Sequence, residues 1–247
     1  GGLRHDAANE LIVRVDCSGY KVGRTGGAPW ASLVKSELWS GWQVGATDFN
    51  TVGIWQPVRL VANDWPCLER PFVRTLALGE KQAKLGVTVE VCAARAGEAP
   101  CEVRVAVRGC GFDAPPCGGS AAVRPLAGMV LADLDVVVPE PRLWWPVGLG
   151  GQPLYEAEIQ LMRGGHTLDR LTVPFGIRTV ERRAGKMQRT SYEAKEWVFH
   201  VNGKPLFIKG SNWMPIDVLA NVSPDEYAWQ VGLARDAGVQ MLRVWGG

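Results

Sequence analysis

The chain has 247 residues, a formal net charge of +2, 47% hydrophobic residues and 21% charged residues. This composition is that of an ordinary globular protein and excludes a disordered or low-complexity chain. The nearly balanced charge gives no basic field of the kind that binds nucleic acid, and the sequence holds no run of about 18 apolar residues that could cross a membrane.

The first three quarters of the chain predict short strands. Apolar and polar residues alternate loosely over 9–16 and more tightly over 53–64. Val-rich segments follow, each bounded by Gly or Pro: PFVRTLALG, AKLGVTVEVCAAR, CEVRVAVRGC, MVLADLDVVVPEP and PLYEAEIQLMRGGHTLDRLTVPFG. The last segment predicts a hairpin that turns at Gly164-Gly165. Strands at this spacing, without helical periodicity, predict an antiparallel β-sandwich. Trp144-Trp145-Pro146 is expected to close the sandwich core or a seam between domains.

The pattern changes after about Glu181. RTVERRAGKMQR, at this change, predicts a solvated basic loop. WVFHVNGKPLFIKGSNW then predicts a hairpin that turns at Asn202-Gly203 and whose second arm runs through LFIKG.

One helix is predicted over SPDEYAWQVGLARDAGV. Ser223 and Glu226 can form a capping box, Pro224 suits the first helical position and Gly238 suits the C-terminal cap. VQMLRVW then predicts a strand. Strand, helix and strand in this order form a parallel βαβ unit, which is the opening of an α/β domain.

No metal or other cofactor is expected. The cysteines form no C-x-x-C pair, and both disulfides and buried thiols would explain them. They are Cys17, Cys67, Cys92, Cys101, Cys110 and Cys117. His5, His166 and His200 have no ligand spacing. The sequence does not decide between a secreted or lysosomal and a cytoplasmic location.

Polar and aromatic residues gather at the two predicted strand ends near the end of the sequence. Asn212, Trp213 and Asp217 follow LFIKG, and Arg243 and Trp245 end VQMLRVW. Functional side chains project from the C-terminal ends of parallel strands, so these side chains are expected to converge. Indole faces pack on sugar rings while amide, carboxylate and guanidinium groups bind hydroxyls, which predicts a sugar site. The plainer interpretation places the tryptophans in a core and pairs Arg243 with Asp217.

Several motifs resemble glycoside hydrolase family 2, particularly its exo-β-mannosidase branch. FGIRTVE, VNGKPLFIKGSNWMPID and LRVWGG resemble its domain junction and first two barrel strands, and LWWPVGLGGQPLYEAEIQL resembles its immunoglobulin-like domain. NELIVRVD and GIWQPVRL resemble the back half of its jelly-roll domain. The resemblance implies a mainly β chain with an α/β start. Its parts would be a galactose-binding-like jelly-roll portion over 1–65, an immunoglobulin-like β-sandwich over 66–181 and the first two strands of a (β/α)₈ TIM barrel over 182–247.

The family implies part of a retaining exo-β-glycosidase that hydrolyses terminal non-reducing β-D-mannose with two glutamates about 5 Å apart. Both glutamates belong to later barrel strands, so no catalytic residue is expected in this chain. The resemblance places five residues in the terminal-sugar subsite: Asn212, Trp213, Asp217, Arg243 and Trp245. The remainder of the chain or a partner chain would complete the jelly roll and the barrel. The expected partner is an oligosaccharide, with no nucleic acid and no membrane.

One motif departs from the family pattern. Where the mannosidase branch has a sugar-binding W-D-W-G-P motif, Trp42 matches but Gln43, Val44 and Ala46 replace the Asp, the second Trp and the Pro. An amide binds hydroxyls less strongly than a carboxylate, so the preference for mannose is open. Asp48 either substitutes for the lost carboxylate or is a turn residue. The alternatives are a β-galactosidase or exo-β-glucosaminidase specificity and a non-catalytic carbohydrate-binding or structural protein.

Overall fold

The computed structural model describes residues 6–15, 54, 57–58, 64–95, 98–184, 197–213 and 222–244. The chain divides into two compact units. One consists of Val61–Gly210 and Arg235–Met241, and the other of Gly1–Leu60, Ser211–Ala234 and Leu242–Gly247. The described residues form no helix with the length and hydrophobicity needed to cross a bilayer.

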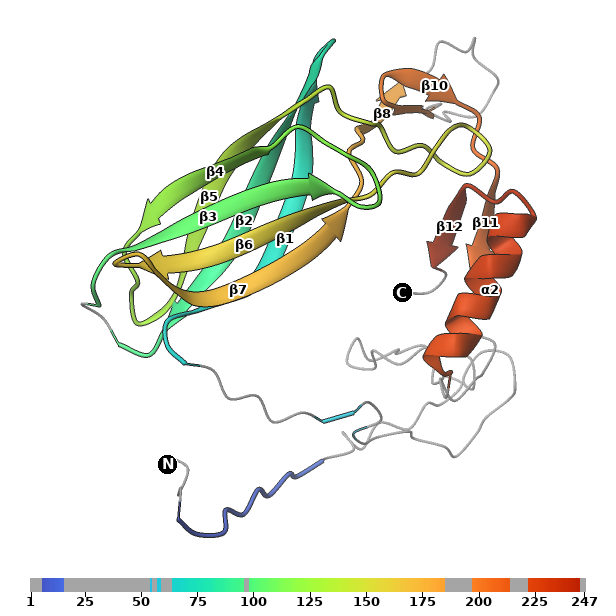
Figure 1. The fold of residues 1–247 in the computed structure, drawn as a ribbon. Helices are drawn as coiled ribbons and strands as arrows, with labels where there is room; N and C mark the ends of the chain where they lie inside the picture. Colours follow the sequence, from blue (N-terminus) through green and yellow to red (C-terminus); the bar gives the residue numbers. More distant parts are fainter. Residues whose placement is uncertain are drawn as a thin grey trace. The chain divides into compact units, whose positions relative to one another are not determined.

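Two antiparallel sheets form a β-sandwich within the first unit (Figure 1). Its strands are β1 (Cys67–Leu78), β2 (Gln82–Ala93), β3 (Cys101–Gly109), β4 (Cys117–Val123), β5 (Gly128–Pro139), β6 (Tyr155–Arg163) and β7 (His166–Phe175). The sheet orders are β1-β2-β5 and β4-β3-β6-β7. The first and last strands are joined where the backbone N–H of Leu68 donates to Asp169 Oδ2 at 2.7 Å. The predicted antiparallel sandwich and the mainly β fold class are confirmed.

The sandwich core comes from side chains that alternate along each strand. In β2, Leu85, Val87, Val89 and Val91 face inward and are fully buried. Val103, Val105, Ile159 and Leu161 are among the residues that meet them from the other sheet. Burying each such side chain stabilises the fold by about 1.5–3 kcal/mol, so this period-2 pattern fixes which face of each strand points inward.

Tyr155 anchors the long connection between β5 and β6. Its side chain is 1% exposed, and its hydroxyl accepts a hydrogen bond from the backbone N–H of Arg142 at 2.8 Å. The ring lies edge-on to Phe112 at 5.0 Å and stacks with Phe175 at 5.9 Å between centroids. A buried Tyr near the start of a strand, whose hydroxyl binds backbone upstream of it, resembles the tyrosine corner found in some β-sandwiches. Burial raises the pKa of the Tyr155 hydroxyl above its ordinary value of 10.0.

Both predicted hairpin turns are confirmed. Gly164 and Gly165 join β6 to β7 with φ of 57° and 83°. Asn202 and Gly203, with φ of 50° and 76°, join β9 (Trp197–Val201) to β10 (Lys204–Leu206). Two consecutive residues with positive φ are typical of the type I′ turn that matches strand twist, which explains the Gly and Asn at these positions.

Two expectations are corrected. The predicted basic loop is in part a strand, because β8 (Val180–Ala184) pairs with β9 in a third sheet of order β10-β9-β8. Its residues are exposed and mostly charged, so they do not show the apolar alternation by which a strand is predicted.

The predicted strand over 9–16 has no strand structure over 9–15, and Leu11 and Ile12 are 81% and 80% exposed. No described strand pairs with this segment, and alternation alone does not make a strand.

Trp144 lies at the seam between the sandwich and the third sheet. Its carbonyl accepts a hydrogen bond from Asn202 Nδ2 at 3.0 Å, while Asn202 Oδ1 accepts one from the backbone N–H of Thr179 at 3.0 Å. The guanidinium of Arg178 lies over the Trp144 ring, 4.1 Å from its centroid. The Trp-Trp-Pro segment therefore contacts the third sheet within this unit, and its place at a seam between domains stays a prediction.

We expect Tyr155→Phe to lower the free energy of unfolding by about 1–3 kcal/mol, because the N–H of Arg142 would lose its acceptor while the ring packing stays. Urea unfolding followed by circular dichroism measures this change. The matched control is Tyr227→Phe, since the Tyr227 hydroxyl has no hydrogen bond in the part of the chain that the structure describes.

Comparing the wild type with Tyr155→Phe at several pH values tests the role of the Tyr155 hydroxyl further. A raised pKa in the folded state means that the contribution of the Tyr155 hydroxyl is complete below the unfolded pKa of about 10 and is lost as the pH rises through the folded pKa. The stability difference between the wild type and Tyr155→Phe should therefore narrow above pH 10. A difference that stays constant or widens there would contradict this assignment.

Candidate functional site

Strand β11 (Gly210–Trp213), helix α2 (Pro224–Asp236) and strand β12 (Met241–Val244) form a strand–helix–strand unit. At the strand starts, the backbone N–H of Gln240 donates to the carbonyl of Lys209 at 2.7 Å. At the strand ends, Arg243 Nη1 donates to Asn212 Oδ1 at 3.1 Å. Start lies beside start and end beside end, so the strands are parallel, as predicted. The single strand predicted through LFIKG is wrong. The chain forms two separate strands there, because β10 ends at Leu206 and β11 begins at Gly210.

Helix α2 begins and ends at the predicted caps. Ser223 Oγ accepts from the backbone N–H of Glu226 at 3.2 Å, and the Glu226 carboxylate accepts from the backbone N–H of Ser223 at 2.7 Å. The C-terminal end is closed by Gly238, with φ of 74°, whose N–H donates to the carbonyl of Arg235 at 2.9 Å. These reciprocal bonds fix the helix between the two strands.

Asn212 and Arg243 are the predicted site residues that the structure brings together. Both side chains are exposed at the C-terminal ends of adjacent parallel strands. A guanidinium has five N–H donors and the contact with Asn212 uses one of them. The Asn212 amide keeps its two donors, so the pair presents several hydrogen-bond donors to solvent. Such a fork of directional donors suits a polyhydroxylated ligand.

Trp213 faces helix α2. Its indole N–H donates to Gln230 Oε1 at 2.7 Å, and its ring lies 5.5 Å from that of Tyr227 between centroids. Successive side chains of a strand point to opposite faces, so Asn212 and Trp213 cannot point the same way. Trp213 is half-buried, and its observed contacts hold the helix on the strand pair.

The other predicted site residues lie outside the described residues. They are Trp42, Gln43, Asp48, Asp217 and Trp245. Their part in a sugar site stays a prediction.

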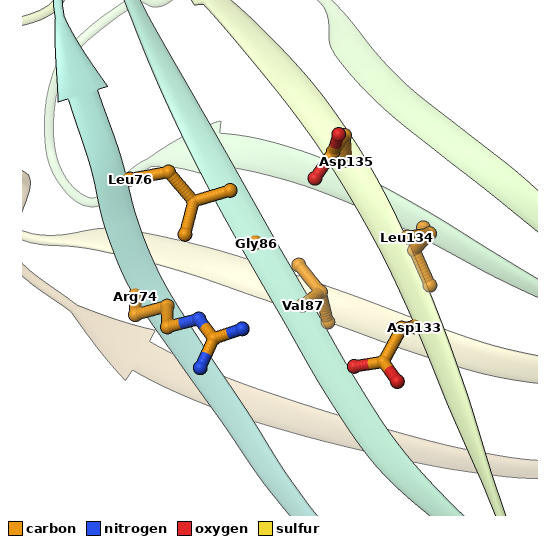
Figure 2. A pocket seen from close by; sticks show the side chains of 7 residues that line it. All are labelled: Arg74, Leu76, Gly86, Val87, Asp133, Leu134 and Asp135. Carbon is orange, nitrogen blue, oxygen red and sulfur yellow. The ribbon is translucent and has the colours of Figure 1, made fainter.

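A hollow of about 370 Å³, which no sequence motif indicates, lies on the outer face of the β1-β2-β5 sheet (Figure 2). It lies over Gly86, and Arg74, Asp133 and Asp135 border it. Asp133 accepts a hydrogen bond from Thr88 Oγ1 at 2.5 Å, and Asp135 pairs with Lys84 at 2.6 Å. Asp133 thus has a hydroxyl partner and Asp135 an exposed cationic one, so both carboxylates are satisfied on the sheet face itself.

The chain resembles known glycosyl hydrolases over most of its length. Residues 68–178 match the model of Glycosyl hydrolases family 2. Beta-mannosidase B of Aspergillus fumigatus is 31% identical over 223 residues, which cover 87% of this chain and 24% of the relative. Beta-mannosidase B of Emericella nidulans is 31% identical over 228 residues, which cover 92% of this chain and 26% of the relative. The chain therefore spans about a quarter of the length of these curated relatives.

Solved structures give the same result. The beta-D-mannosidase from Dictyoglomus thermophilum superposes with a TM-score of 0.70 at 29% identity, over 86% of this chain and 25% of that one. An exo-chitosanase from Amycolatopsis orientalis gives a TM-score of 0.54 at 24% identity, over 72% of this chain and 20% of that one. The second match concerns the fold alone.

We expect Trp213→Phe to lower the free energy of unfolding by about 1 kcal/mol, because it removes the hydrogen bond to Gln230 and keeps an aromatic ring beside Tyr227. Trp229→Phe is the matched control, since Trp229 lies on the same unit and is 60% exposed. Urea unfolding measures both variants. Equal stability of Trp213→Phe and the control would show that the contact with Gln230 contributes nothing.

Proposed function

Because this chain belongs to glycosyl hydrolases family 2, we propose that it is part of a retaining exo-β-glycosidase, most like a β-mannosidase, that hydrolyses terminal non-reducing β-D-mannose. We propose a carbohydrate as the substrate and, more specifically, mannose as its terminal sugar. The names of the matched relatives support mannose. The chemistry would use one glutamate as acid and base and another as nucleophile, and we assign neither to these residues.

The observation that carries the proposal is the pairing of Asn212 with Arg243 at the ends of β11 and β12. In barrels of parallel strands this edge holds the active site. We assign to the pair the binding of hydroxyls of the terminal sugar, with Arg243 as donor and Asn212 as both donor and acceptor. The bond between the two side chains fixes the guanidinium before the sugar arrives, which reduces the entropy lost on binding.

The roles proposed for the remaining residues follow the same chemistry. Trp245 would pack on the apolar face of the sugar ring, and Asp217 would accept hydrogen bonds from hydroxyls. Trp42, Gln43 and Asp48 would close the subsite from the proposed jelly-roll portion. The beginning of a TIM barrel over 182–247 is likewise part of the proposal, supported by the parallel β11-α2-β12 unit.

A second specificity is supported by one sequence observation. Gln43 stands where the mannosidase motif has an Asp, and an amide binds a sugar hydroxyl less strongly than a carboxylate does. A β-galactosidase or exo-β-glucosaminidase type of activity is therefore the alternative. Aryl β-mannoside, β-galactoside and β-glucosaminide, offered to the full-length protein at equal concentration, separate these activities. We expect the mannoside to have the highest kcat/KM. Binding of the sugars without turnover of any of them would instead support a non-catalytic carbohydrate-binding protein.

In the full-length protein, Arg243→Ala should lower kcat/KM for the aryl β-mannoside about 10- to 150-fold, because a hydrogen bond to a charged donor is worth about 1.5–3 kcal/mol. The matched control is Arg235→Ala in the last turn of α2, where the exposed Arg235 contacts only its neighbour Asp236 among the described side chains. We expect the control to stay within about twofold of the wild type, as is usual for exposed ion pairs. Equal activity of the two variants would remove Arg243 from the site.

A further inference from the structure

The β1-β2 ladder places two thiols and two carboxylates on one face. Cys67 lies directly opposite Cys92, and Glu69 lies directly opposite Glu90. Residues two apart in a strand share a face, and so do residues directly opposite each other in an antiparallel pair. Leu68 and Val91, the pair between them, face the core. The four polar side chains therefore lie together on the outer face of the sheet.

Three of these side chains are close enough to share one ion. The carboxylate oxygens of Glu69 and Glu90 and the sulfur of Cys92 lie within 4.8 Å of one another. Metal–sulfur and metal–oxygen bonds of zinc are about 2.3 and 2.1 Å, which puts neighbouring ligand atoms of a tetrahedral site roughly 3.5 Å apart. Small side-chain rotations would close this difference. The fourth position lies toward Cys67, the residue opposite Cys92.

The cluster combines a buried thiol with two half-buried carboxylates. Cys92 is 9% exposed, the side chain of Glu90 is 16% exposed, and the Cys92 thiol has no hydrogen-bond partner in the part of the chain that the structure describes. Two carboxylates directly opposite each other are unfavourable on their own. A bound cation would remove this repulsion and stabilise the thiolate.

Among the residues that the structure describes, Arg70 is the cationic side chain paired with this cluster. Its Nη1 lies 3.3 Å from Glu90 Oε1, but the side chain is 77% exposed and the contact is a single one. Arg70 has a φ of 46° and stands at the register shift between Glu69 and Phe72. Bulges of this kind re-aim side chains. Arg70 thus competes with any ion for Glu90, through one exposed contact.

We propose that Glu69, Glu90 and Cys92 bind a divalent cation of borderline softness, for which Zn²⁺ is the best fit, with Cys67 as the candidate fourth ligand. One or two thiolates with carboxylates favour zinc over the hard cations Ca²⁺ and Mg²⁺, which take oxygen ligands alone. The ion would fasten β1 to β2 at the edge of the sandwich, so its role is structural and separate from the proposed glycosidase site. The expectation of no metal rested on spacing along the chain, so it did not consider residues that strand pairing brings together.

The test is a Zn²⁺ titration of the full-length protein, reduced and freed of metal, against a chelator of known affinity. We expect one equivalent to bind, and Co²⁺ in its place should give a thiolate-to-cobalt charge-transfer band. Cys92→Ser should abolish the band and weaken binding at least about 100-fold, since even outer partners of ligands contribute 10- to 100-fold. Glu69→Gln should weaken binding without disturbing the core, which keeps the test valid if Cys92→Ser unfolds.

Two further variants sharpen the result. Arg70→Ala should tighten Zn²⁺ binding about two- to fivefold, because the competing ion pair with Glu90 is lost. Cys110→Ser is the matched control: Cys110 is exposed outside the cluster and should leave binding unchanged. The proposal is overturned if the wild type binds no Zn²⁺, if Cys92→Ser binds it as tightly as the wild type, or if protein purified without reductant carries a Cys67–Cys92 disulfide.

Discussion

The contact between the inward-facing side chains of the two sheets is the interaction on which the rest of the described sandwich depends. Because β2 gives its Leu and Val residues to this contact, the residues between them must face outward. Glu90 and Cys92 stand at such outward positions, and so does Gly86 beneath the hollow. The same alternation that builds the core therefore decides which polar side chains can meet on the outer surface.

Local signals in the sequence predicted the local parts of the structure. The turns at Gly164-Gly165 and Asn202-Gly203 follow from residues that accept positive φ, and the ends of α2 follow from caps a few residues apart. Pairing between distant segments was not accessible in this way. Strand β8 carries its charges outward, and only its partner β9 makes it a strand. Glu69 and Cys92 are 23 residues apart in sequence, and only the register of β1 on β2 brings them together.

The candidate sugar site shows the same division. The ends of two parallel strands could be expected to meet, and Asn212 does meet Arg243. The sequence motif did not show which face Trp213 takes. Strand geometry decides this, because successive side chains alternate and Asn212 points to the opposite face. Helix α2 meets Trp213 with Tyr227 and Gln230, a contact that no motif around Trp213 indicated. The meeting of the two strand ends was thus easier to predict than the face on which each side chain lies.

The hydrogen bond from Leu68 to Asp169 has a consequence for the timing of folding during synthesis. It joins β1 to β7 across 101 residues. The bond can therefore form only after nearly the whole sandwich has left the ribosome. At the usual rate of about 5–20 residues per second, that wait lasts roughly 5–20 s. During this interval β1 and β2 can pair locally, but the apolar face of their sheet lacks the sheet that will cover it. The nascent sandwich is therefore most exposed to misassociation before its last strand emerges.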